Sequence, residues 1–110
     1  MVDWNAYREQ LVRRFREFST LAPDTMKGIV SLGQAGEKTN FLDAKTRELI
    51  SLAVAVTTRC DGCIAFHAGE AKKAGATVDE LSEALGVAIH LNAGATLVYS
   101  ARTLDAFDRA

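Results

Sequence analysis

The segment CDGCIAFH, residues 60–67, combines two thiols and an imidazole at spacings that suit redox chemistry. Cys60 and Cys63 are three positions apart, so at the first turn of a helix their side chains can close a small disulfide ring. Unpaired backbone N–H groups at such a helix end favour thiolate over thiol. His67 follows Cys63 by about one helical turn and leans toward it, because helical side chains point toward the N-terminus. An imidazole there can take the thiol proton, which predicts that Cys63 attacks and Cys60 resolves.

Glu48 is an acid just ahead of a strongly apolar segment, residues 49–56. Burial of a carboxylate there is costly without a partner. If the helices before and after Arg59 are antiparallel, the axial offset between Glu48 and His67 is about 5 Å at about 1.5 Å per residue. Direct contact is marginal at that offset. We therefore expect a water bridge, or an oblique helix crossing, to let Glu48 orient His67 and relay its proton.

The elements that must position these residues are all helices, because apolar side chains recur at three- and four-residue steps. We predict an all-α fold of about six helices in one domain, residues 1–110. The expected helices cover approximately residues 4–22, 26–35, 43–59, 60–75, 77–92 and 93–107. The segment GQAGEKTN, residues 33–40, is the one clear loop.

Capping signals set several of these boundaries. Asp24 and Asp43 are expected N-caps of the second and third helices. Gly75 is a plausible left-handed residue ending the fourth helix. Thr77 and Glu80 match the T-x-x-E capping box that opens the fifth.

The first helix is predicted to be amphipathic, with aromatic and aliphatic residues on its packing side and charges opposite. The apolar side comprises Trp4, Tyr7, Leu11, Phe15 and Phe18. The solvated face comprises Arg8, Arg13, Arg14, Arg16 and Glu17.

A thioredoxin fold is the alternative that a strand over LAVAVTT, residues 52–58, would suggest. A thioredoxin site needs a cis-proline that faces the disulfide from a later segment. The only proline here is Pro23, which precedes the cysteines. No second alternating run exists to build a sheet, so the pattern favours helices.

Charge and apolar patterning limit the partners. Thirteen basic against fourteen acidic side chains leave a net charge of -1, so we expect no nucleic-acid or anionic-lipid binding. The start, MVDWNAYREQ, does not resemble a secretory signal, which predicts a cytoplasmic protein. Residues 84–101 are 18 positions without a charge, but their polar content argues against a membrane span. A helix this apolar in a chain this short instead indicates self-association. His90, which lies in this segment, is then expected to be a core or subunit-contact residue.

The spacing of Glu48, Cys60, Cys63 and His67 resembles the active-site signature of the AhpD-like alkylhydroperoxidases, in the carboxymuconolactone decarboxylase superfamily. The resemblance extends over LDAKTRELISLAVAVTTRCDGCIAFHAGEAKKAGAT and EALGVAIHLNAGATLVYSARTLDAF, about the last two thirds of the chain. It implies an all-helical, obligately oligomeric fold, often a hexamer.

The resemblance also implies reduction of alkyl hydroperoxides or hydrogen peroxide through the cysteine pair. By this analogy Cys63 is the peroxidatic cysteine, Cys60 resolves and meets an external thiol, dithiol or lipoyl-type reductant, and His67 with Glu48 relays protons. No bound cofactor or metal is implied. The best-known members carry a histidine between the cysteines, whereas this chain has Asp61-Gly62, and an acid beside Cys60 opposes its ionisation.

Other hypotheses stay open at this stage. The cysteines could be buried core residues beside an ordinary histidine. Cys60, Cys63 and His67 could bind zinc with Glu48 or His90 as a fourth ligand, in a non-catalytic redox or metal-binding oligomer. A carboxymuconolactone decarboxylase-like enzyme is a further alternative, although such members lack the cysteine pair.

Overall fold

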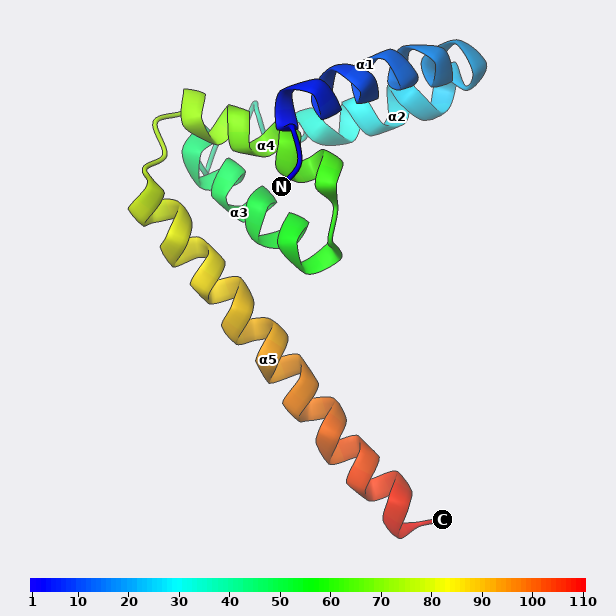
Figure 1. The fold of residues 1–110 in the computed structure, drawn as a ribbon, viewed down its shortest axis with the longest axis vertical. Coiled ribbons are helices and arrows are strands. Elements are labelled where there is room, and N and C mark those ends of the chain that lie inside the picture. The colour runs from blue at the N-terminus through cyan, green and yellow to red at the C-terminus, as the bar shows by residue number, and fades with distance from the viewer.

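The chain folds into five helices and no strands. The computed structural model describes residues 1–110. The helices are α1 (Trp4–Leu21), α2 (Pro23–Gln34), α3 (Ala44–Thr58), α4 (Asp61–Lys73) and α5 (Val78–Asp108). In Figure 1, α1 and α2 form one hairpin, α3 and α4 form a second, and α5 extends away from both. The predicted all-α class is confirmed.

The helix α5 replaces two of the expected helices, so the prediction of a break near residue 92 is wrong. The helix is continuous from Val78 to Asp108. Asn92 donates from its amide to the Ala88 carbonyl at 2.7 Å and to the Thr57 hydroxyl at 2.8 Å, so it ties α5 to α3. Neither Asn92 nor Gly94 has a positive φ. Because neither removes a backbone N–H, the helix can pass through both residues.

The caps that the sequence indicates at three other boundaries are confirmed. Asp43 Oδ1 accepts from the Thr46 N–H at 2.8 Å at the start of α3. At the start of α5, Thr77 Oγ1 accepts from the Glu80 N–H at 3.1 Å, and Glu80 Oε1 accepts from the Thr77 N–H at 3.0 Å. Gly75, which follows α4, has φ +85°.

The cap predicted for the second helix is wrong. Asp24 lies inside the first turn of α2, which begins at Pro23, and Ala22 is the N-cap without a side-chain bond. Proline suits the first helical position because its φ is already helical and the N–H it lacks would have no helical acceptor.

An ion pair joins the starts of α3 and α5. Lys45 Nζ lies 2.8 Å from Glu80 Oε2. This ionic hydrogen bond raises the pKa of Lys45 and is the main cause of a lowered pKa of Glu80. Together with the Asn92 contact to Thr57, it fixes the first half of α5 along α3.

The core is small and lies where α3, α4 and α5 meet. Five of 110 residues are buried, namely Leu52, Ala55, Ala65, Ala71 and Ala88. The C-terminal part of α5 extends away from the other helices (Figure 1) and carries exposed apolar side chains such as Leu97 and Tyr99. By length and composition alone, α5 could cross a membrane. His90, expected in a core or subunit contact, is exposed in the single chain.

Helix α1 packs on α4 through Arg8. The sequence pattern placed Arg8 on the solvated face, and that assignment is wrong. Its Nε and Nη2 both donate to the Ala65 carbonyl, at 3.0 and 2.7 Å. The Phe15 and Phe66 rings stack beside this contact, with centroids 6.3 Å apart. A guanidinium can serve such an interface because its alkyl stem packs while its fork finds an acceptor.

Substitution of Arg8 tests this attachment. Arg8→Met keeps the stem but loses both bonds to the Ala65 carbonyl, and we expect a loss of about 1 kcal/mol in the free energy of unfolding. Urea denaturation measures it, with Arg16→Met, an exposed arginine of the same helix, as the control. Equal stability of the two variants would contradict a structural role for Arg8.

Candidate functional site

The cysteine pair opens α4 as a disulfide between Cys60 and Cys63. Cys60 is the N-cap of the helix, and its Sγ accepts from the Cys63 N–H at 3.1 Å. Both residues are half-buried. The hypothesis of two unbonded core cysteines is therefore wrong. The N-terminal position also places the positive end of the helix dipole beside the sulfurs, where it favours a thiolate once the bond is reduced.

Glu48 and His67 are in direct contact. Glu48 Oε2 lies 2.7 Å from His67 Nδ1. The contact is therefore not marginal, and of the two routes expected for it, a bridging water is not needed. An offset of about 5 Å between the two positions, estimated from helical rise, is short enough for a flexible glutamate side chain to cover. The Glu48 side chain is 21% exposed and the His67 side chain is 38% exposed, so solvent screens this pair only partly.

This contact assigns the protons of the imidazole. An ionised carboxylate only accepts hydrogen bonds, so Nδ1 carries the hydrogen that faces Glu48. In neutral His67 the lone pair is therefore on Nε2, which is free to act as a base. Glu48 thus fixes the tautomer and stabilises the ring when it gains a second proton.

Glu48 and His67 line an open cavity of about 580 Å³ between α3, α4 and the loop that precedes α3. The loop is held by Arg47, which donates to the Gly36 carbonyl at 3.2 Å and to Asn40 Oδ1 at 3.1 Å. Sequence reasoning did not identify Arg47 in this role, because both its partners lie in a loop without periodic pattern. A small substrate could enter this cavity and reach the imidazole.

A second feature that the sequence did not indicate is the position of α1 beside the cysteines. The Leu11 Cδ1 atom lies 3.0 Å from where a Cβ on Gly62 would be. Gly62 separates the two cysteines, so Leu11 packs on the backbone of the disulfide loop itself. A side chain at Gly62 would require the end of the Leu11 side chain to shift.

The residues of the alternative zinc hypothesis do not gather around a common point. Cys60 and Cys63 are bonded to each other, and no group of three or more His, Cys, Asp and Glu residues is arranged to hold a metal ion. His90, a candidate fourth ligand, is exposed on α5.

Comparison with known proteins identifies relatives over nearly the whole chain. The model of the carboxymuconolactone decarboxylase family matches residues 23–106. An uncharacterized protein of Haemophilus influenzae is 50% identical over 105 residues, which are 96% of this chain and 93% of that protein. An uncharacterized protein of Cupriavidus necator is 30% identical over 99 residues, 90% of this chain and 88% of that one.

A solved structure is also similar. The crystal structure of an apo carboxymuconolactone decarboxylase family protein from Legionella pneumophila matches with a TM-score of 0.76 and 39% sequence identity. The match covers 96% of this chain and 95% of that one. The Haemophilus influenzae and Legionella pneumophila matches each cover 96% of this chain, so they include most of α1, which precedes the residues matched by the family model.

Proposed function

Because the chain belongs to the carboxymuconolactone decarboxylase family, and its cysteine pair adjoins a carboxylate-bound histidine, we propose that it is a thiol-dependent peroxidase. Its substrates are alkyl hydroperoxides or hydrogen peroxide. The observation that carries the proposal is the 2.7 Å contact between Glu48 and His67. His67 lies on α4, the same helix whose first turn carries the cysteine pair. A general base that a carboxylate orients, one helical turn after a cysteine, is the arrangement that activates a thiol nucleophile.

The oxidative half-reaction starts from the dithiol. His67 Nε2 takes the Cys63 proton, and Glu48 stabilises the resulting imidazolium through the Nδ1 hydrogen. The Cys63 thiolate attacks one peroxide oxygen, the O–O bond breaks, and the sulfur becomes a sulfenic acid. The departing alkoxide or hydroxide takes a proton from His67 and leaves as alcohol or water.

The reductive half-reaction returns the site to its starting state. The Cys60 thiol attacks the sulfenic sulfur, water leaves, and the disulfide forms. An external dithiol then exchanges with the disulfide, which restores both protein thiols as the reductant is oxidised to its own disulfide. The proposal needs no bound cofactor or metal, and the cytosol, the compartment the sequence predicts, maintains reductants of this class.

Two cysteine substitutions separate this proposal from its alternatives. Cys63→Ser should abolish peroxide consumption, because the attacking sulfur is gone. Cys60→Ser should still consume one peroxide per chain and form one sulfenic acid, which mass spectrometry of a dimedone adduct detects. The reverse pattern would make Cys60, whose sulfur accepts the Cys63 N–H, the nucleophile. Peroxide consumption unaffected by either change would reject thiol peroxidase activity in favour of decarboxylase-like or non-catalytic alternatives.

We also infer that the protein works as a homo-oligomer, with a hexamer the assembly that the family resemblance implies. The support is the exposed apolar surface of α5, which a single chain leaves uncovered. Its large apolar side chains that are at least half exposed are Val78, Val87, Ile89, Leu91, Leu97, Val98, Tyr99, Leu104 and Phe107. Burial of such side chains stabilises by about 1.5–3 kcal/mol each, enough for copies of this helix to drive association.

A charge on this surface should dissociate the oligomer. Leu97→Asp should shift the mass measured by light scattering from the oligomer to smaller species, since a carboxylate resists burial against apolar neighbours. Ser82→Asp adds the same charge near the start of α5 and should leave the mass unchanged. A monomeric wild type, or wild type recovered with lipid vesicles, would contradict self-association through α5.

A further inference from the structure

We propose that two copies of this chain pair antiparallel through one face of α5, about a two-fold axis that passes between residues 92 and 93. The inference rests on the self-association proposed for α5 and deepens it, because it names the surface and the register of the contact. The face is a stripe of residues at steps of four, four, three, four and four, so its members lie on one side of the helix. The stripe comprises Glu83, Val87, Leu91, Gly94, Val98 and Arg102.

An antiparallel second copy in this register matches the stripe pair by pair. Each residue faces the one that lies equally far on the other side of the midpoint between residues 92 and 93. Val87 thus faces Val98 of the second copy, and Leu91 faces Gly94. A two-fold contact makes each of these pairs twice, which is how a surface binds its own copy.

The apolar pairs of the stripe are open in the single chain. Val87 is 58% exposed, and Leu91 and Val98 are each 61% exposed. Nothing lies within 4 Å of where a Cβ on Gly94 would be. A glycine opposite a leucine lets the two helix axes approach to about 8 Å, the short end of the usual distance between packed helices.

The charges at the ends of the stripe complete the match. Residues 84–101 carry no charged side chain, and this segment is bounded by Glu83 and Arg102, which face each other across the axis. Neither makes an ion pair within its own chain. The Arg102 guanidinium lies 5.0 Å from the centre of the Tyr99 ring, a contact that leaves its charge available. Beyond the stripe Asp105 faces Glu80, and each already has an ion pair within its own chain.

The second copy has a seat on α3 as well as on α5. A groove of about 390 Å³ lies between the two helices, with Val54 on its α3 side and Val87 and Leu91 on its α5 side. In the proposed register, residues 94–98 of the second copy lie over this groove. Residues 49–58 of α3 carry no charge, so covering the groove buries no charged side chain from that segment.

The packing of α5 favours a second copy over a membrane as the occupant of this face. The helix is long and apolar enough to cross a membrane. Its first half, however, is held to α3 by the hydrogen bond between Asn92 and Thr57 and by the ion pair between Lys45 and Glu80. Insertion into a bilayer would break both contacts, whereas pairing with a second copy leaves both intact.

Cross-linking tests the register. Val87→Cys and Val98→Cys are made separately in the full chain that also carries Cys60→Ser and Cys63→Ser, which leaves one thiol per chain. After subunit exchange, a mixture of the two variants treated with a short bismaleimide should give a covalent dimer that links position 87 to position 98. Either variant alone should not, because like positions lie eleven residues apart along the paired helices, about 16 Å at about 1.5 Å per residue.

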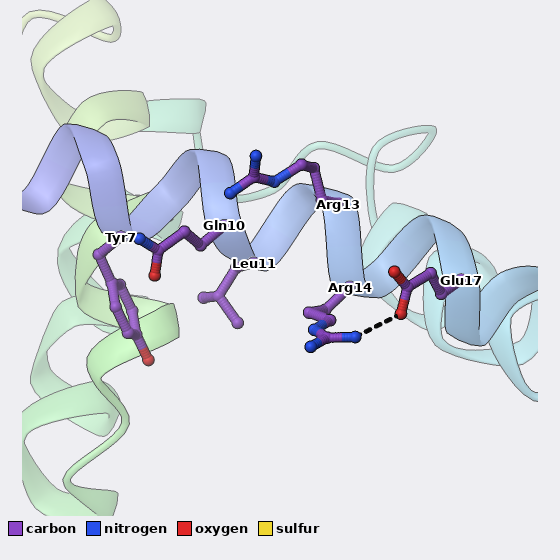
Figure 2. A pocket seen from close by; sticks show the side chains of 6 residues that line it. All are labelled: Tyr7, Gln10, Leu11, Arg13, Arg14 and Glu17. Carbon is purple, nitrogen blue, oxygen red and sulfur yellow. Dashed lines mark hydrogen bonds and ion pairs between the residues drawn. The ribbon is translucent and has the colours of Figure 1, made fainter.

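Charge reversal tests the ion pairs in the chain with its native cysteines. Glu83→Arg places two arginines together at both ends of the contact, and should raise the dissociation constant measured by sedimentation equilibrium about ten-fold at low salt. Adding Arg102→Glu restores opposite charges and should restore tight association. Glu83→Arg with Arg13→Glu has the same net charge and should stay weakly associated. Arg13 lies on α1, where it points away from Leu11 (Figure 2).

The proposal is overturned if the mixture gives no more cross-linked dimer than the single variants, if Arg102→Glu fails to rescue Glu83→Arg, or if the wild type is a monomer bound to phosphatidylcholine vesicles. An oligomeric wild type without the link between positions 87 and 98 rejects this interface and leaves self-association itself standing, whereas a monomeric wild type rejects both. Neither assay involves peroxide, so failure of the peroxidase proposal would not change either result.

Discussion

The contact between the Glu48 carboxylate and His67 Nδ1 is the interaction on which the proposed chemistry depends. It joins α3 to α4 and directs the free nitrogen of the imidazole away from the carboxylate. Because Cys60 caps α4 and Cys63 lies in its first turn, the same packing that brings Glu48 and His67 together also places His67 on the helix that carries the sulfurs. The buried residues Leu52, Ala55, Ala65 and Ala71 come from these same two helices, and Ala88 of α5 completes the core. The packing of α3 against α4 therefore both builds the core and sets the geometry of the site.

Local signals in the sequence identified several helix starts, although not that of α2, where Asp24 lies inside the first turn. The helix that starts at the cysteines, the Asp43 cap and the Thr77–Glu80 capping box each need only a few adjacent positions. The break expected near Asn92 failed because polar content alone does not end a helix when every residue keeps its backbone N–H. Asn92 instead binds Thr57, a partner that no local pattern identifies.

Long-range contacts were harder to predict from sequence. Helical rise gave a usable axial offset for Glu48 and His67, but whether the side chains meet depends on how α3 and α4 pack. Arg8 was assigned to solvent by its charge, whereas its partner is a backbone carbonyl of α4, and backbone acceptors leave no trace in a residue pattern. The contact of Leu11 with Gly62 was equally hard to predict, because the only sequence signal for it was a glycine in the first turn of a helix.

The two ends of the chain extend the site in different ways. Helix α1 packs against α4 through Arg8 and Phe15, and its Leu11 side chain lies on Gly62 of the disulfide loop. Helix α5 supports α3 with its first half and exposes apolar side chains along its second. The small number of buried residues supports the oligomer that we propose, because a single chain buries little apolar surface by itself.

The most direct test of the central claim is the rate at which iodoacetamide alkylates Cys63 as a function of pH. The measurement uses reduced Cys60→Ser protein, with and without His67→Gln. The account predicts that alkylation already reaches its plateau near neutral pH when His67 is present. In His67→Gln the rise in alkylation rate should move to the alkaline range of a free thiol, about pH 8.5. A profile that His67→Gln leaves unchanged, or a rise at the free-thiol position in both proteins, would contradict the account.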